Sequence, residues 1–208
     1  MATVKSAGQL KLEAGRLCLD FANTLDWHAS EHPVEKLTTY ADLVAWAHKI
    51  GLLGEDLARR LNDLADAHPR IASATLEKAR TLREAMYDIF VAVAHGGAPQ
   101  QADIDTVNAA LAEMLNRSRL VHGDTGFVWD WGGSEDDLDQ MLWWVVQSAT
   151  EVMTSDELLR VGQCADDRGC GWLFYDTSKN RTRRWCDMRG CGNRAKARRH
   201  YAKVMSDE

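Results

Sequence analysis

Four cysteines near the C-terminus are the residues of this 208-residue chain whose type and spacing could support chemistry. Cys164, Cys170, Cys186 and Cys191 follow the pattern C-x5-C-x15-C-x4-C, which is two close pairs joined by a spacer. A tetrahedral metal ion needs two such pairs, and zinc prefers thiolate ligands. Glycine flanks both Cys170 and Cys191, as tight turns around a metal require. The pattern predicts one structural zinc ion, because four protein ligands leave no open position for a reactive water.

Disulfides, incidental thiols and a redox switch are the alternative uses of these cysteines. The chain has an odd number of cysteines, and a reducing cytoplasm disfavours disulfides. The N-terminus carries Glu13, Arg16 and Asp20 where a signal peptide needs an unbroken apolar stretch, and the chain has no membrane-spanning apolar run. We therefore expect a cytoplasmic protein without a membrane partner. Cys18 lies in an apolar run and is expected to be buried.

The two parts of the chain have opposite charge. Residues 1–159 carry 13 basic and 25 acidic side chains, whereas residues 160–208 carry 12 basic and 6 acidic ones. This asymmetry predicts an acidic domain over 1–159 and a basic domain over 160–208 with an anionic partner. The predicted nucleic-acid contacts are Lys179, Arg181, Arg183, Lys196, Arg198, Arg199 and Lys203. The alternative is that arginines neutralise the doubly negative zinc-thiolate cluster, for which Arg184 and Arg194 are the candidates.

Apolar spacing predicts a mainly α-helical N-terminal domain. Helices are expected at 40–50, 55–67, 74–94 and 101–117, with His68-Pro69 as an interruption. A small β-hairpin is expected from 119–122 and 127–131. Ser134 resembles the N-cap of a further helix over 137–153, and a short connecting helix follows at 154–161. The tryptophans of these helices are expected to pack between helices, and the Trp-rich last helix is a candidate homodimer interface.

The zinc module is expected to contain a β-hairpin and a helix. Residues 172–176 and 182–186 would form the hairpin around Ser178-Lys179-Asn180, and a helix would run from Cys191 through Lys203. This order predicts a treble-clef-like or ribbon-like zinc fold that follows the multi-helical domain. About 45 residues bury too little apolar area to fold alone, so the metal is needed for folding.

The motifs of this module resemble those of the CGNR zinc-finger family of bacterial proteins. The segments CGWLF at 170–174, RRWC at 183–186 and CGNRAKARRH at 191–200 occur in the family's order. Upstream, LCLDFANT at 17–24 resembles the opening of the ABATE domain, which usually precedes this finger and is described as a stress-induced transcription regulator. The resemblance implies two domains and a DNA-binding role.

The resemblance leaves the role of the N-terminal domain open between sensing a small-molecule effector and dimerisation. Asp20, Asn23 and Thr24 are the candidate pocket groups, because they share a helical face beside an apolar segment. The alternative is that they serve as caps and as hydrogen bonds between helices.

RNA binding, protein binding and catalysis are the alternatives to DNA binding. RNA binding would require Trp172, Phe174 or Tyr175 to be exposed for stacking on bases. A zinc-stabilised adaptor would bind a protein instead. We expect no enzyme, because the chain lacks G-x-S-x-G, P-loop, dinucleotide and HExxH motifs, and its seven histidines are scattered.

Overall fold

The computed structural model describes residues 12–123 and 126–206, and these form seven α-helices with three small antiparallel hairpins. The N-terminal region contains α1 (Leu17–Ala22), β1 (Leu25–Asp26), β2 (Val34–Glu35), α2 (Tyr40–Lys49), α3 (Glu55–Ala67), α4 (Pro69–Ala94) and α5 (Gln101–Arg117). It continues through β3 (Ser118–Gly123), β4 (Gly126–Trp131), α6 (Gln140–Met153) and the 3-10 helix η2 (Asp156–Arg160). The C-terminal region contains β5 (Val161–Gln163), β6 (Leu173–Tyr175), the π-helical turn η3 (Met188–Gly192) and α7 (Asn193–Ser206). The mainly α-helical class is confirmed.

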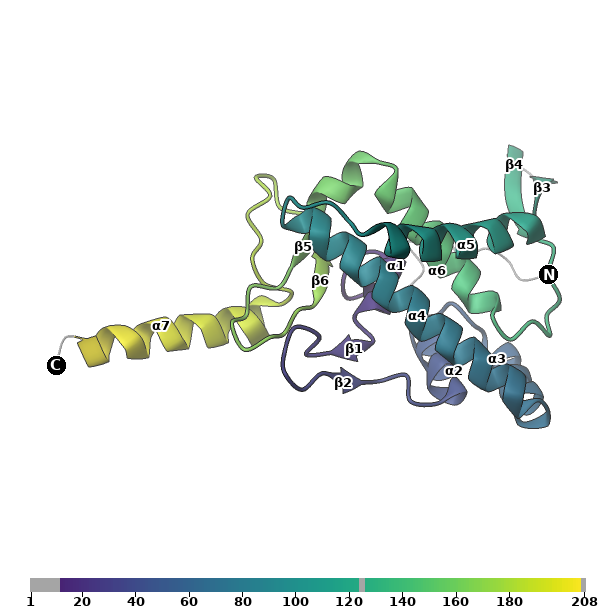
Figure 1. Cartoon of the computed structure of the whole chain (residues 1–208), viewed down its shortest axis with the longest axis horizontal. Coiled ribbons are helices and arrows are strands. Elements are labelled where there is room, and N and C mark those ends of the chain that lie inside the picture. Colours follow the sequence, from purple (N-terminus) through teal and green to yellow (C-terminus); the bar gives the residue numbers. More distant parts are fainter. Residues whose placement is uncertain (1–11, 124–125, 207–208) are drawn as a thin grey trace.

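The core forms around α1 and the long helix α4. Leu19 and Phe21 of α1 are fully buried, as are Met86 and Phe90 of α4. The described residues from 12 to 175 are called the body here. In Figure 1 the 26-residue α4 runs through the body with the other N-terminal helices around it. Burying large side chains of this kind stabilises the fold by about 1.5–3 kcal/mol each. Cys18 is also fully buried, and burial raises the pKa of its thiol to about 12.

The predicted helices at 40–50, 55–67 and 101–117 correspond to α2, α3 and α5, but two helix starts differ from the prediction. Pro69 begins α4 rather than interrupting it, because proline at the first helical position lacks only an N–H that would have no partner there. Ser134 is not a helix N-cap: its Oγ accepts from the N–H of Asp136 within a turn, and α6 begins only at Gln140.

The predicted hairpin of the zinc module was wrong in its second strand. β6 pairs with β5, which precedes the first cysteine, and residues 182–186 form no strand. The buried carboxylate of Asp176 explains the difference, since it accepts from the N–H groups of Ser178 and Arg183 and so holds this segment in a turn. Arg184 O then accepts from the N–H of Ala165.

The strands β5 and β6 belong structurally to the N-terminal body. Val161 and Leu173 are buried in its main hydrophobic core. The side chain of Asn23 in turn forms two hydrogen bonds with the main chain of Leu173, donating to its carbonyl at 2.9 Å and accepting from its N–H at 2.8 Å. The Tyr175 N–H also donates to Ala14 O. The body therefore holds the hairpin that flanks the first cysteine pair.

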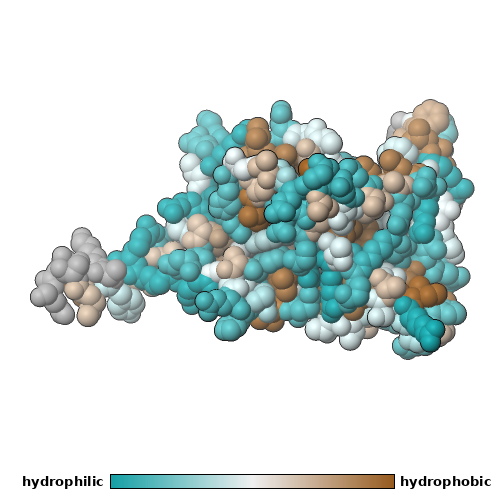
Figure 2. Space-filling view, in the orientation of Figure 1, coloured by the Kyte–Doolittle hydropathy of each residue, from teal (hydrophilic) through white to brown (hydrophobic). Residues whose placement is uncertain are grey.

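The remaining C-terminal residues, 176–206, are called the arm here. They form the segment after β6, the turn η3 and helix α7, and Figure 1 shows α7 projecting away from the body. In Figure 2 the residues where this projection leaves the body are mostly hydrophilic.

The attachment of β6 to the body can be tested with Asn23→Ala. Removing the amide leaves the buried N–H and carbonyl of Leu173 without their partners, which we expect to lower the free energy of unfolding by roughly 2–4 kcal/mol. Urea denaturation at saturating zinc measures this. Asn108→Ala, at an exposed position of α5, is the matched control and should change stability by less than about 0.5 kcal/mol. Equal effects of the two substitutions would contradict the attachment.

Candidate metal centre

The four cysteines converge on one point. Their sulfur atoms all lie within 4.8 Å of one another, and the Sγ atom of Cys186 is 3.7 Å from those of both Cys170 and Cys191. Four thiolates at the usual zinc–sulfur distance of about 2.3 Å would be about 3.8 Å apart in a tetrahedron. The cysteines are thus positioned to bind one metal ion, and their donor set fits one structural Zn²⁺.

The first pair is shaped by a short turn between β5 and β6. The N–H of Cys164 donates to Trp172 O at 2.8 Å and closes this turn. Gly169 and Gly171 have φ angles of +87° and +68° and lie against the loop of Ala29 and Ser30, so close that a Cβ at Gly169 would be 2.5 Å from Ser30 Cα. Glycine is required at both positions by conformation and by space. The body therefore shapes the first half of the site.

The second pair is shaped by the turn η3, which leads into α7. The carboxylate of Asp187 accepts from the N–H of Gly190 at 2.6 Å, and its carbonyl accepts from the N–H of Gly192 at 3.0 Å. These bonds place Cys191 at the start of α7. Since Cys186 and Cys191 lie on the arm, a metal ion bound by both pairs joins the arm to the body.

The four cysteine thiols lie close enough together to share protons. Hydrogen bonds from the thiols of Cys170 and Cys186 lower the pKa of Cys164 to about 2. The same sharing raises the pKa of Cys186, and burial raises that of Cys191. Without a metal, four neighbouring sulfurs cannot all ionise together. A dication removes this constraint, and zinc sites require deprotonated thiolates.

Arg194 and Asp166 link the zinc ligands to α7. The Nη2 of Arg194 donates to Cys191 Sγ at 2.8 Å and to Asp166 Oδ2 at 2.9 Å, so Arg194 is placed for the neutralising role expected of it. Arg198 also donates to Asp166, whose side chain is completely buried. Burial opposes ionisation of Asp166, but the hydrogen bonds from Arg194 and its neighbours hold the pKa of the carboxyl well below its usual range.

Sequence reasoning missed Asp166 and Trp27. Asp166 stands two positions after a ligand, and its partners Arg194 and Arg198 are four apart on α7, which is the only signal that could have found it. Trp27, from the N-terminal region, packs against the cysteines, and the guanidinium groups of Arg168 and Arg194 lie 5.3 and 5.5 Å from its ring centre. The body therefore contributes to the shell around the metal site.

The basic residues predicted to contact nucleic acid fall into two groups. Arg183 and Arg198 are half-buried and used inside the protein: Arg183 donates to the carbonyls of Tyr175, Trp185 and Cys186, and Arg198 pairs with Asp166 and Asp167. The others with described side chains are exposed, namely Lys179, Arg181, Lys196 and Arg199. The backbone of Lys203 lies in α7, and its side chain is outside the described part. Arg184 lies over the Trp185 ring at 5.4 Å.

The three predicted pocket residues line one cavity of about 580 Å³ between α1, α2 and Trp172. Their polar atoms also serve the fold. Asp20 accepts from the N–H groups of Glu13 and Ala14, Asn23 holds Leu173, and Thr24 donates to Phe21 O. Both the pocket and the capping interpretations therefore describe these residues.

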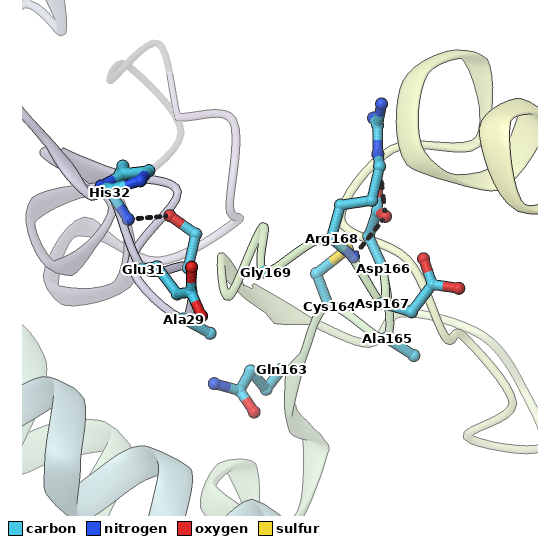
Figure 3. A pocket seen from close by; sticks show the side chains of 11 residues that line it. Ala29, Glu31, His32, Gln163, Cys164, Ala165, Asp166, Asp167, Arg168 and Gly169 are labelled. Atoms are coloured by element: carbon cyan, nitrogen blue, oxygen red, sulfur yellow. Dashed lines mark hydrogen bonds and ion pairs between the residues drawn. The ribbon is translucent and has the colours of Figure 1, made fainter.

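A second, more open cavity of about 690 Å³ lies beside the first cysteine pair. Figure 3 shows Glu31 and His32 on one side and Cys164 with the loop of Asp166, Asp167 and Arg168 on the other, with Gln163 between them. The 29–32 loop and the first metal-binding turn line this cavity together, and they are in contact where Gly169 lies against Ser30.

Fold and site together define a zinc-finger protein with a multi-helical N-terminal domain. The family model of ABATE, whose description is "putative stress-induced transcription regulator", matches residues 15–156, and the model of the CGNR zinc finger matches residues 160–204. Because the first match covers more than half of the chain, the protein belongs to the ABATE family. Comparison with curated proteins returns no match. Among the helices of the described residues, none has both the length and the hydrophobicity needed to cross a membrane.

Metal removal should separate the two halves of the site. We expect a chelator to extract one zinc ion per chain and to raise amide hydrogen exchange in 186–206, while the amides of β6 stay protected because α1 and the core still hold them. Exchange followed by mass spectrometry measures this. Cys191→Ser in the presence of zinc should cause the same loss of amide protection in the arm. Equal loss of protection in β6 and the arm would contradict the assignment of β6 to the body.

Proposed function

We propose that this protein is a transcription regulator that binds DNA through its basic arm, which the zinc ion holds in place. The observation that carries the proposal is the projection of α7 with exposed Lys196 and Arg199. These residues are three apart and share a helical face. A helix of 14 residues is about 21 Å long, and an α-helix of this kind fits the major groove of DNA. Exposed Lys179 and Arg181 add positive charge to the arm.

Positive charge in the arm has two uses. Some arginines have partners inside the protein, namely Arg183, Arg194 and Arg198, and the other basic residues with described side chains are exposed. These arginines stabilise the turn, the thiolates and the buried Asp166. Of the exposed residues, Arg199 lies 5.9 Å over the Trp185 ring but hydrogen-bonds no zinc ligand, and phosphate contacts would explain why such residues accumulate on the arm. Within the arm, the segment from Lys179 to Lys203 has ten basic residues and one acidic residue, Asp187, so its positive charge exceeds what the zinc-thiolate cluster needs.

The aromatic residues of the finger favour DNA over RNA. Phe174 is 2% exposed, the guanidinium of Arg16 lies 3.9 Å over the Tyr175 ring, and Trp172 donates its indole N–H to Asp26 at 3.0 Å. Phe174 is buried, Tyr175 is covered by Arg16, and Trp172 lines the cavity beside α1, so the three rings form no shared platform for stacking on bases. A protein-interaction adaptor is the remaining alternative, and its binding would depend little on salt. The proposal assigns no reaction to the zinc site and places the protein in the cytoplasm with its DNA.

The salt dependence of binding tests this proposal. If Lys179, Arg181, Lys196, Arg199 and Lys203 each contact a phosphate, log affinity for duplex DNA should fall with log salt at a slope of roughly -4 to -5. Fluorescence anisotropy over a salt series measures the slope.

Lys196→Ala with Arg199→Ala should make that slope shallower by about 2. The double variant Arg59→Ala with Arg70→Ala is matched in charge and lies on exposed positions of the body, so it should leave the slope unchanged. Binding that is absent, or insensitive to salt, would sink the DNA proposal.

The exposed hairpin β3–β4 supports self-association as a role of the N-terminal domain. Leu120, His122, Phe127 and Trp129 lie on one face of it, because residues paired across strands share a face. Phe127 is 72% and Leu120 59% exposed, and Figure 2 shows hydrophobic residues at this end of the molecule. The indole of Trp143 on α6 is instead buried. We therefore place the dimer interface on the hairpin rather than on α6, since a lone two-stranded hairpin is only marginally stable.

The molar mass of the protein, measured by light scattering as it elutes from a size-exclusion column, tests self-association. We expect a dimer for the native chain and a monomer for Phe127→Ser, because serine removes the most exposed aromatic ring of the hairpin face. Ile71→Ser, at a 56% exposed apolar position of α4, is the control and should remain dimeric. A native monomer, or a dimer that survives Phe127→Ser unchanged, would contradict this interface.

A further inference from the structure

The cavity between α1, α2 and Trp172 has the size and walls of a small-molecule site. Its volume of about 580 Å³ falls within the range typical of ligand pockets. Trp46 of α2 and Trp172 of the finger supply aromatic surface, and Ile50 adds an aliphatic one. A ligand bound here would replace water against apolar walls on α2 and on the first metal-binding turn.

The charges that line the cavity select the sign of the ligand. Four carboxylates face it, from Glu13, Asp20, Asp26 and Asp42, against two ammonium groups, from Lys36 and Lys49. Lys36 already pairs with Asp26 at 3.4 Å, and Lys49 lies 4.0 Å from Glu13. An anionic ligand would thus meet uncompensated negative charge, whereas a cation would relieve it.

Asp20 is the group that would gain most from a cation. Burial raises the pKa of its carboxyl to about 6, so it is largely ionised at neutral pH in a partly desolvated position. Its hydrogen bonds come from two backbone N–H groups. Within residues 12–123 and 126–206, no lysine or arginine forms an ion pair with it. Lys49 acts on Asp20 from the same cavity without forming an ion pair, and a positive ligand beside Asp20 would supply a counter-charge at short range.

We propose that this cavity binds an organic cation with an aromatic or apolar body, held by Asp20 and by the indoles of Trp46 and Trp172. Indole faces attract organic ammonium groups, and carboxylates add the charge. The site would also be connected directly to the metal centre. Trp172 lies two residues after the zinc ligand Cys170, and its indole N–H is bonded to Asp26 on the cavity wall. The claim that the cation regulates DNA binding rests on the proposed DNA-binding function. The claim that the cavity binds the cation does not depend on it.

Calorimetric titration of the zinc-loaded full chain with benzyltrimethylammonium tests the site. We expect saturable binding at least tenfold tighter than that of the neutral benzyl alcohol or of the anion phenylacetate. Asp20→Asn should weaken binding of the cation about tenfold, and Asp63→Asn, an exposed carboxylate on α3, should not. Lys49→Glu, at a 78% exposed position on the rim, should strengthen it, which a folding defect cannot explain. No saturable binding, equal binding of the three probes, or no gain from Lys49→Glu would overturn the site.

The effector role has its own readout. DNA affinity is measured with and without saturating benzyltrimethylammonium at constant ionic strength, with Asp20→Asn as the control that should lose the effect. A change in DNA affinity of threefold or more supports an effector site. Unchanged DNA affinity at full occupancy overturns the effector role. If the protein fails to bind DNA even without the probe, the result contradicts the proposed DNA-binding function and not the cation site.

Discussion

The packing of four sulfur atoms within 4.8 Å of one another is the constraint on which the arm depends. In the absence of a cation the protons must be shared, so that one thiol is held as a thiolate while the pKa values of Cys186 and Cys191 are raised. A zinc ion satisfies all four at once and replaces repulsion with four bonds. Among the described side chains of the arm, Cys191 is the only buried hydrophobic one, so the metal centre rather than an apolar core holds the start of α7 in place.

The two halves of the site have different supports. Cys164 and Cys170 lie in the turn between β5 and β6, and Leu173 of β6 lies in the main core and is held by Asn23, whereas Cys191 is held by a turn of the arm. Zinc therefore works as a joint between an acidic body and a basic projection, rather than as the nucleus of a separate small fold. Trp172 lies two residues after the ligand Cys170, so the cavity beside α1 that it lines adjoins this joint.

The metal ligands could be predicted from the sequence because thiolate pairs with flanking glycines have few other uses in a reducing compartment. The helices α2, α3 and α5 could be predicted because local apolar spacing determines them. The partner of β6 could not, since the choice between β5 and residues 182–186 depends on Asn23, 150 positions from Leu173, and on the turn at Asp176. The role of Asp166 was equally hidden, because its arginine partners meet it only once the metal site has folded.

X-ray absorption at the zinc edge of the purified full chain tests the central claim most directly, together with the metal content of the same sample. The account predicts one zinc ion per chain with a single shell of four sulfur atoms at about 2.3 Å. A shell containing nitrogen or oxygen, or a chain that folds with α7 protected while holding no metal, would contradict it.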